Sequence, residues 1–310
     1  MSAKATRQVF GETIAKLGEK NPNIVVLDAD LSKSTKSDIF AKKFPERFFE
    51  MGIQEANMVG VAAGMANAGK IPFICSFSCF ITGRFDQIRL SLAYSNANVC
   101  IVGSHAGVGI GEDGYSQQGL EDIAVMRSLP NMVVIQPADE IECASALEFL
   151  ADYEGPSFIR TTRQNLMAVH GPDFKFQLGK SDTLREGDDV AIFATGGAVQ
   201  GAVQAHEALK AAGIHARVVN VASLKPFDAE AVVDAAKSCK GGIVTVEDHQ
   251  IIGGLGSAVA EAMAEAGVGA RLLRVGLDSF GESGTPEELY RHFGLDGAGI
   301  EKSVRKFLGK

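Results

Sequence analysis

Strand-like and helix-like segments alternate along almost the whole of this 310-residue chain. Short apolar runs typical of buried strands are each followed by a longer segment with helical periodicity. Such alternation is typical of parallel sheets covered by helices. In the first half the pattern predicts strands at Ile24–Asp28, Phe73–Ser76, Val99–Gly103, Met132–Gln136 and Ser157–Arg160. It predicts helices at Ala5–Lys20, Glu55–Ala68, Phe85–Ser95, Leu120–Arg127 and Glu140–Tyr153.

The alternation stops after Thr162, where a polar and turn-rich stretch begins. We interpret residues 171–187 as a domain linker that includes a short hairpin. Strands are predicted again at Val190–Ala194, His215–Asn220, Gly242–Val246 and Arg271–Val275. The helices predicted here are Ala198–Ala212, Ala229–Lys237 and Leu255–Ala266. The sequence therefore predicts an α/β protein with two parallel-sheet domains, at residues 1–170 and 188–310.

Net charge, apolar stretches and cysteine content indicate which partners and which cellular compartment are excluded. The net charge of −8 argues against a nucleic-acid partner, so the phosphates of a substrate would have to meet a few local cations. The longest apolar stretch, residues 58–66, is too short to span a membrane, and the N-terminus shows no signal peptide. Five cysteines without a C-x-x-C pair argue against disulfides and a zinc site. These features predict a cytoplasmic protein without a metal site of its own.

A glycine-rich segment at residues 103–114, G-S-H-A-G-V-G-I-G-E-D-G, directly follows a predicted strand. It brings His105 and Asp113 onto a loop at the carboxyl end of a strand, where α/β proteins place their chemistry. A surface turn is the alternative interpretation. The three last glycines match the dinucleotide fingerprint G-x-G-x-x-G, but six residues separate the strand from the first of them. A nucleotide fingerprint should turn directly from strand to helix, so we reject that interpretation.

Glu55 opens a predicted helix whose other residues are apolar or very small. A glutamate in a first helical turn is also favoured by the helix dipole, so periodicity alone leaves both interpretations open. In the functional interpretation, a buried carboxyl could stay protonated and donate a hydrogen bond or shuttle a proton.

Two aromatic residues and an arginine also follow predicted strands. Phe77 and Phe80 are either core residues or a platform for a planar ring. Arg163 is a phosphate candidate because guanidinium binds phosphate in a two-pronged geometry. The alternative is that Arg163, like Arg7 and Arg160, makes a solvated ion pair.

Taken together, these motifs resemble those of transketolases, over the whole chain. The segment around Glu55, G-I-Q-E-A-N-M, is similar to the one that holds the essential glutamate of the family. The segments S-F-S-C-F-I-T-G-R-F-D-Q-I-R, with Phe77 and Phe80, and R-T-T-R-Q-N-L, with Arg163, also resemble family motifs. Near the start, A-T-R-Q with Arg7 and D-A-D-L-S-K-S-T match further ones.

The resemblance implies transfer of a two-carbon ketol unit from a ketose phosphate to an aldose phosphate, with thiamine diphosphate as cofactor. Glu55 would hydrogen-bond N1′ of the aminopyrimidine, and His105 would be the second catalytic residue. Phe77, Phe80 and Gln117 would contact the cofactor; Gln117 stands where many transketolases have a second histidine. The residues implied in substrate binding are Arg7, Asp30, Ser34, His105, Asp113 and Arg163.

One family feature is missing from this sequence. Transketolases resemble this chain preceded by a further domain, which holds the diphosphate and Mg²⁺ through a G-D-G motif followed by an asparagine. We therefore expect a separate N-terminal subunit that carries the divalent ion, joined to this chain in an α2β2 heterotetramer of the pentose phosphate pathway. Two alternatives remain: the β-type subunit of another split thiamine enzyme, such as a 2-oxoacid dehydrogenase, or a non-catalytic assembly subunit.

Overall fold

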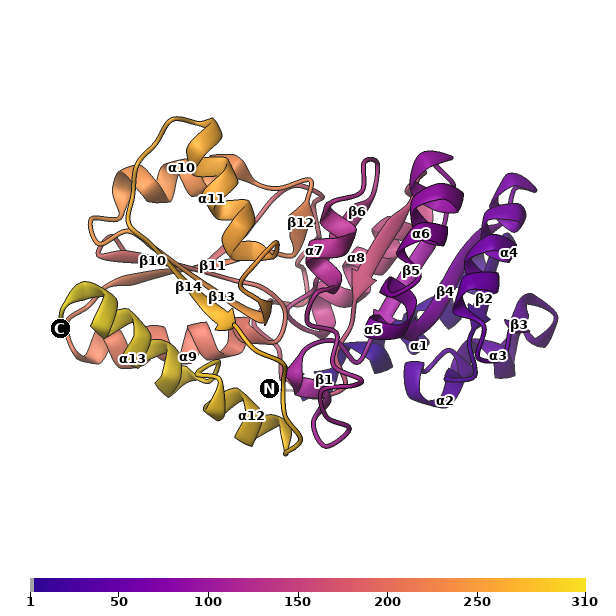
Figure 1. Ribbon diagram of the computed structural model, residues 1–310, viewed down its shortest axis with the longest axis horizontal. Helices are drawn as coiled ribbons and strands as arrows, with labels where there is room; N and C mark the ends of the chain where they lie inside the picture. The colour runs from indigo at the N-terminus through magenta and orange to yellow at the C-terminus, as the bar shows by residue number, and fades with distance from the viewer. Residues whose placement is uncertain (1–2) are drawn as a thin grey trace.

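The computed structural model describes residues 3–310 and contains two α/β halves lying side by side (Figure 1). The first half is built on a seven-stranded sheet with the order β12-β6-β7-β5-β4-β2-β3. Six of these strands run parallel. Their bounds are β2 Ile24–Asp28, β3 Phe48–Glu50, β4 Ile71–Phe77, β5 Cys100–Ser104, β6 Val133–Ile135 and β7 Ser157–Arg160. The remaining strand, β12 (Ser223–Lys225), pairs antiparallel with β6 although it belongs to the second half of the sequence.

Helices cover both faces of this sheet. One face carries α1 (Thr6–Lys20), α3 (Asp38–Lys43) and α8 (Glu140–Asp152), whose apolar side chains form one core cluster with the strands. The other face carries α4 (Glu55–Asn67), α6 (Phe85–Ile88) and α7 (Asp122–Arg127). Short elements occupy the connections: α2 Ser32–Thr35, η1 Pro45–Arg47, α5 Ser78–Thr82, η2 Arg89–Tyr94 and η3 Val108–Ile110. A two-stranded ribbon joins β1 (Ala3–Ala5) to β8 (Asn165–Met167).

The second half is built on a five-stranded sheet with the order β14-β13-β10-β11-β9. Its strands are β9 Asp182–Arg185, β10 Val190–Ala194, β11 Ala216–Asn220, β13 Ile243–Gln250 and β14 Leu272–Leu277. All are parallel except β9, which pairs antiparallel with β11. In Figure 1 α10 (Ala229–Ser238) and α11 (Leu255–Glu265) lie above this sheet, and α9 (Ala198–Ala211), α12 (Pro286–His292) and α13 (Gly297–Leu308) lie below it.

The predicted parallel-sheet α/β class is confirmed, and two local expectations are corrected. The hairpin expected between the halves is absent from the described residues, because β9 pairs with β11 and β8 pairs with β1. The strand expected to end at Val246 continues to Gln250 as β13, so that His249 lies within the strand. The continuation carries β13 from its own sheet to the boundary with the first half. Among residues 3–310, no helix combines the length and the apolarity needed to cross a bilayer.

Candidate functional site

The predicted site residues gather at the carboxyl edge of the seven-stranded sheet. Asp30 and Ser34 follow β2, Phe77 ends β4, His105 follows β5 and Arg163 follows β7. Because neighbouring parallel strands end at the same edge, residues far apart in the sequence meet there. Arg7, in the first turn of α1, joins them because its backbone N–H donates to the carbonyl of Thr162, across 3.3 Å.

Glu55 lies at the first position of α4 and is 5% exposed. Its carboxylate has one hydrogen-bond partner among the described residues, the hydroxyl of Ser76, and the Oγ–Oε1 distance is 3.5 Å. That distance is at the weak end for a hydrogen bond. A buried carboxyl with so little internal compensation is suited to a strong donor from a ligand, because burying such a group without partners is costly.

Three rings stack in series at the end of β4. Phe77 packs on the imidazole of His105, with ring centroids 3.8 Å apart, and on Phe80 at 5.5 Å. Phe77 is almost fully buried between these neighbours, whereas Phe80 in α5 keeps part of its surface open. The structure thus places both predicted aromatic residues at the site. Only Phe80 leaves an accessible ring for a further planar group.

The imidazole of His105 is held in one protonation state and one tautomer. Nη1 of Arg7 donates to Nε2 of His105 at 2.8 Å, so Nε2 is the acceptor and Nδ1 carries the hydrogen. Nδ1 then donates to Oγ of the adjacent Ser104. Burial, followed by the positive charges of Arg7, Arg163 and Lys36, lowers the pKa of His105 to about 3. His105 also has a φ of +57°, in the left-handed region that is strained for residues other than glycine.

Arg163 ties the glycine-rich loop to the end of β7. Its Nη1 donates to the carbonyl of Ile110 and lies 3.4 Å from Oε2 of Glu112 and 3.7 Å from Oδ1 of Asp113. Arg163 is also close enough to Arg7 to be the second cause, after burial, of the lowered pKa of Arg7. Two guanidinium groups therefore lie close enough to repel each other, in a chain whose net charge is −8.

A buried aspartate organises the segment that carries Ser34. Asp28, at the end of β2, accepts hydrogen bonds from the hydroxyls of Thr35 and Ser37, at 2.7 and 2.8 Å. The carbonyl of Ser34 in turn accepts from Nη1 of Arg7 at 3.0 Å. This segment therefore contacts the site through its backbone, and it delivers a cation that sequence reasoning missed, Lys36.

Lys36 follows α2 in the left-handed conformation, with a φ of +71°. Its carbonyl and Cβ lie where a side chain at Gly11 of α1 would have to stand, so only a glycine permits this approach. Gly11 lies one helical turn after Arg7. Lys36 is a further source of the positive charge felt by His105, and none of the ion pairs among the described residues involves it.

Two other predicted residues are not part of the hydrogen-bonded cluster around His105. Asp30 is exposed, with a φ of +64°, and its backbone N–H donates to Oε1 of Glu50 at 2.7 Å. Gln117 is half-buried, and its carbonyl faces Sγ of Cys79 at 3.2 Å. No described contact joins either side chain to His105 or Arg7, and the roles assigned to these two residues, like those of the other site residues, are predictions. Among residues 3–310, no group of three or more His, Cys, Asp and Glu side chains is arranged to hold a metal ion.

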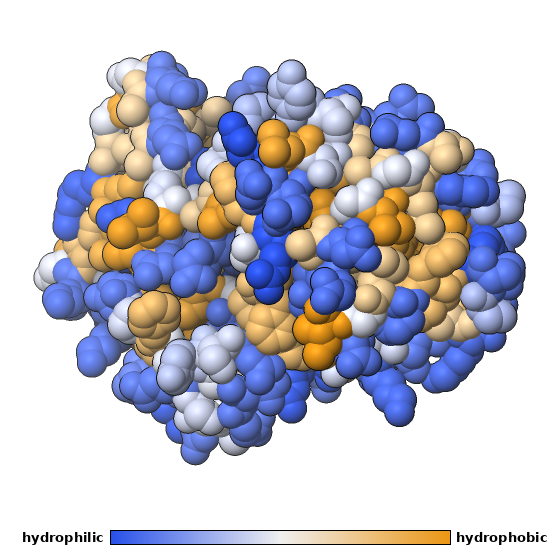
Figure 2. Space-filling view, turned by 45° about the vertical axis from the view of Figure 1, so that its right-hand side comes forward, coloured by the Kyte–Doolittle hydropathy of each residue, from blue (hydrophilic) through white to orange (hydrophobic). Residues whose placement is uncertain are grey.

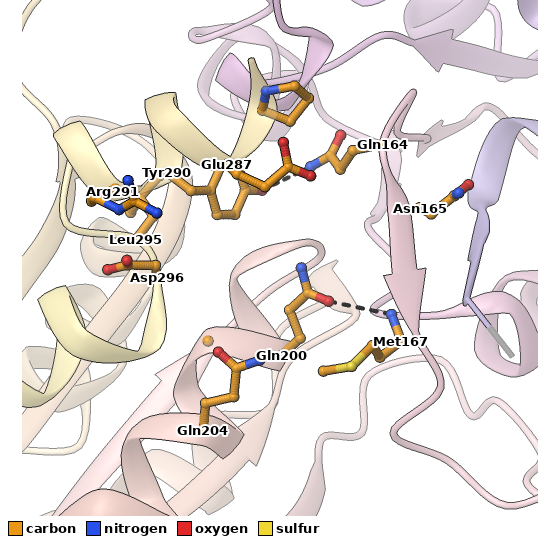
Figure 3. A pocket seen from close by; sticks show the side chains of 12 residues that line it. Gln164, Asn165, Met167, Gln200, Gln204, Glu287, Tyr290, Arg291, Leu295 and Asp296 are labelled. Carbon is orange, nitrogen blue, oxygen red and sulfur yellow. Dashed lines mark hydrogen bonds between the residues drawn. The ribbon is translucent and has the colours of Figure 1, made fainter. Parts of the chain in front are cut away.

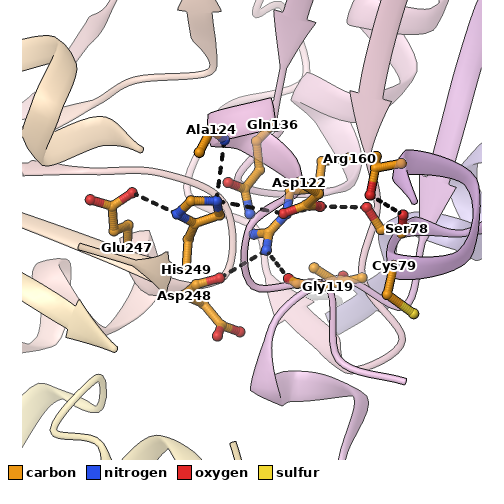
Figure 4. A network of polar contacts seen from close by, with 12 residues as sticks. Ser78, Cys79, Gly119, Asp122, Ala124, Gln136, Arg160, Glu247, Asp248 and His249 are labelled. Atoms are coloured by element: carbon orange, nitrogen blue, oxygen red, sulfur yellow. Dashed lines mark hydrogen bonds and ion pairs between the residues drawn. The ribbon is translucent and has the colours of Figure 1, made fainter. Parts of the chain in front are cut away.

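The interpretation of Arg160 as a solvated side chain is wrong. We considered a solvated ion pair for it, but its side chain is 1% exposed and its Nε donates to Oδ2 of Asp122 at 2.7 Å. The last residues of β13 complete this buried network, which Figure 4 shows at the boundary of the two halves. The carboxylate of Asp248 was also missed, because a buried acid at a domain boundary has no periodic signal in the sequence.

Family models match both halves of the chain. The model of the transketolase pyrimidine binding domain matches residues 2–169, and that of the transketolase C-terminal domain matches residues 179–300. The chain belongs to the transketolase family. The "Putative transketolase C-terminal section" of Methanocaldococcus jannaschii is 47% identical, over 99% of this chain and 97% of that protein.

Two further transketolase-family relatives have a similar extent. A protein of Clostridium sp., described as a 6-deoxy-6-sulfo-D-fructose transketolase subunit, is 40% identical over 97% of this chain and 93% of its own length. A structure described as a split gene transketolase, inactive β4 tetramer, superposes with a TM-score of 0.90 at 45% identity and covers 99% of both chains. The chain spans about half the length of the mammalian transketolases that it matches. These likenesses do not favour a 2-oxoacid dehydrogenase subunit.

Proposed function

We propose that this chain is the C-terminal subunit of a split transketolase and that it transfers a two-carbon ketol unit between sugar phosphates. One observation carries the proposal: a neutral histidine, two arginines and an aspartate share the sheet edge that also holds the buried carboxyl of Glu55. Hydroxyl groups and a distal anion, the two features of a sugar phosphate, match these side chains.

The residues present fit thiamine diphosphate at its pyrimidine end. Glu55 offers a buried carboxyl that has one weak internal partner, and Phe80 offers a partly open ring nearby. When bound, thiamine diphosphate supplies the nucleophilic carbon and the electron sink that cleavage of a carbon–carbon bond needs. In this proposal, Glu55 holds a proton at N1′ of the aminopyrimidine, while Phe80, supported by Phe77, fixes the plane of the ring.

The remaining residues bind and orient the sugar. Nε2 of His105 is an acceptor, and it can take a hydrogen bond from a donor hydroxyl when Arg7 turns toward an anion. Asp113 accepts from a second hydroxyl, and Arg163, which also donates to the carbonyl of Ile110, turns a guanidinium N–H to the distal phosphate. Arg7, Arg163 and Lys36 together supply the positive charge that this phosphate requires.

A partner chain would supply what these residues cannot, which is the site for the diphosphate and its divalent ion. Helix α4 supports such a partner. It contains one charged residue, Glu55, and is otherwise mostly apolar or small, yet Gly60 and Gly64 face open space. A helix that is apolar on most sides is normally buried. Ile53, just before α4, and Tyr115, just after the glycine-rich loop, are 74% and 65% exposed.

Exposed apolar side chains also occur on other parts of the surface, where a partner chain could cover them. Large apolar residues are also exposed at Leu90, Tyr94, Ile252 and Phe280. Figure 2 shows several apolar patches, in orange, among the polar residues of one face. Patches of this kind mark surfaces that other chains cover. We propose an α2β2 assembly with an N-terminal transketolase subunit, acting in the cytoplasm and in pentose phosphate metabolism.

A substrate comparison tests this function. The two-chain complex, supplied with thiamine diphosphate and Mg²⁺, should transfer ketol units from fructose 6-phosphate to an aldose phosphate and should not decarboxylate pyruvate. The His105→Ala and Asp113→Ala variants should each lower kcat/KM for the sugar donor. Pyruvate decarboxylation without ketol transfer would point to the 2-oxoacid alternative, and a complex inactive toward both would point to an assembly subunit.

A further inference from the structure

The carboxylate of Asp248, from β13 of the second half, holds the backbone of the glycine-rich loop in the first half. Its Oδ1 accepts from the N–H of Val108 at 2.8 Å, and its Oδ2 accepts from the N–H of Gly109 at 3.3 Å. A side chain at Gly107 would overlap this carboxylate, so the loop approaches Asp248 as closely as a glycine allows. Asp248 is 2% exposed.

The four backbone N–H groups that follow His105 all have hydrogen-bond acceptors. After His105, the N–H of Ala106 donates to the carbonyl of Thr161 at 3.3 Å, and that of Gly107 donates to the carbonyl of Gly119 at 2.9 Å. The next two N–H groups donate to Asp248. Four successive amides are therefore fixed, two by the first half itself and two by the second half. His105 and Asp113 lie on either side of this fixed segment.

Arg160 also links the segment after the glycine-rich loop to β13. Its Nη2 donates to the carbonyl of Gly119 at 2.6 Å and to the backbone carbonyl of Asp248 at 2.9 Å. The carbonyl of Gly119 is the one that also fixes Gly107. Figure 4 shows the Arg160 guanidinium between Asp122 and these two carbonyl groups. A single buried cation thus joins β7, the loop and β13.

A side chain of α12 also hydrogen-bonds to Asp248. The hydroxyl of Tyr290 donates to Oδ2 of Asp248 at 2.9 Å, and the same hydroxyl accepts from Nε2 of Gln164 at 2.9 Å. Figure 3 shows the Tyr290 and Gln164 side chains meeting at the edge of a cavity between the two halves, which has a volume of about 370 Å³. Gln164 directly follows the phosphate candidate Arg163.

We propose that Asp248 is a positioning residue for the proposed ketol transfer, by which the second domain fixes the loop that presents His105 and Asp113 to the sugar. This inference rests on the proposed function. It gives the C-terminal domain a role in substrate binding in addition to assembly. Asp248 acts through backbone amides and does not itself touch the substrate.

The first test is hydrogen exchange in the free chain, which needs no activity. In Asp248→Asn one carboxylate oxygen becomes an NH₂ group, so Val108 or Gly109 loses its acceptor. Exchange in the peptide covering residues 105–114 should accelerate by roughly tenfold or more, the effect of losing a charge-assisted hydrogen bond. Tyr290 borders the cavity, and Tyr290→Phe removes only its hydroxyl, so this variant should accelerate exchange in the same peptide less. Unchanged exchange in both folded variants would overturn the proposal.

The matched control is Glu261→Gln. It removes another ion pair between the halves, the 2.6 Å contact of Glu261 with Nη2 of Arg127, and it leaves the loop untouched. This variant should show wild-type exchange in the loop. If Glu261→Gln accelerates loop exchange as much as Asp248→Asn does, the effect is general loosening of the domain boundary, and the positioning role is wrong.

The second test is kinetic and uses the complex with the N-terminal subunit. Asp248→Asn should raise KM for the ketose phosphate by roughly tenfold or more, with a smaller change in kcat. A purely structural role would lower Tm and the active fraction while leaving KM unchanged, and that result would contradict the proposal. If the wild-type complex transfers no ketol units, the proposed function fails, whereas the exchange experiment still decides whether Asp248 fixes the loop.

Discussion

Nη1 of Arg7 lies 2.8 Å from Nε2 of His105, so a permanently charged donor faces the one acceptor atom of this imidazole. The contact fixes the tautomer, because Nδ1 must then carry the hydrogen that Ser104 accepts. It also opposes protonation, because a charged imidazole would place two cations in contact. A substrate anion that draws Arg7 away would release Nε2 to a sugar hydroxyl.

His105 should therefore remain neutral across the physiological pH range. Its pKa is lowered from 6.5 to about 3, mainly by burial. A lowered folded-state pKa means that the stability contributed by His105 is fully present above pH 6.5 and is lost as the pH falls toward 3. Nitrogen NMR of labelled histidines should show the His105 imidazole as a fixed Nδ1–H tautomer between about pH 5 and 8. Its signal should vanish in His105→Gln, and titration near pH 6.5 would contradict the assignment.

Glu55→Gln should abolish most ketol transfer and leave the fold intact. The amide retains hydrogen-bonding atoms but cannot exchange a proton, and losing a proton-transfer group costs on the order of 10²–10⁴ in rate. The matched control is Glu46→Gln, at an exposed glutamate in η1, which should keep wild-type turnover. Steady-state assays of the two complexes, with Tm as a check on folding, make the comparison. A near-normal kcat in Glu55→Gln would reduce Glu55 to a helix-start residue.

Arg163→Ala should weaken the use of phosphorylated donors far more than that of hydroxypyruvate. A charge-assisted contact with phosphate is worth about 1.5–3 kcal/mol, or about ten- to a hundredfold in kcat/KM. Arg185→Ala, at an arginine that pairs with Glu207 on the surface, is the control. Equal losses for both donors would indicate that Arg163 supports the loop through Ile110 rather than binding the phosphate.

Lys36→Gln should raise KM for phosphorylated donors by about three- to tenfold, since a nearby, partly solvated charge contributes on the order of 1 kcal/mol. The effect should shrink as ionic strength rises, because salt screens a charge of this kind. Lys33→Gln removes an exposed charge from α2 and serves as the control. The same KM in both variants, at low salt, would exclude Lys36 from the anion site.

Much of this architecture could be predicted from the sequence, because buried strands and amphipathic helices leave periodic patterns. The edge elements could not. Strand β12 crosses from the second half of the chain to pair with β6, and β9 lies in a segment without strand-like alternation. Pairing partners on another element supply the stability of such short strands, and a local pattern does not contain them.

Some residues of the candidate site could be predicted from the sequence, and others could not. His105, Asp113 and Arg163 stand out because they lie on loops that follow apolar strands, where α/β proteins place their functional side chains. Asp248 and Lys36 do not stand out. Asp248 lies inside a strand, where an acid would normally be excluded, and its partners are backbone amides about 140 residues earlier in the chain. Lys36 depends on a left-handed backbone beside Gly11, and no local motif predicts that contact.

The dependence of activity on a second chain is tested most directly by reconstitution. The purified chain would be assayed for ketol transfer with thiamine diphosphate and Mg²⁺, alone and with increasing amounts of the N-terminal transketolase subunit from the same genome. We predict no transfer by the chain alone and activity that saturates at equal numbers of the two chains. Appreciable ketol transfer by the partner-free chain would contradict the account.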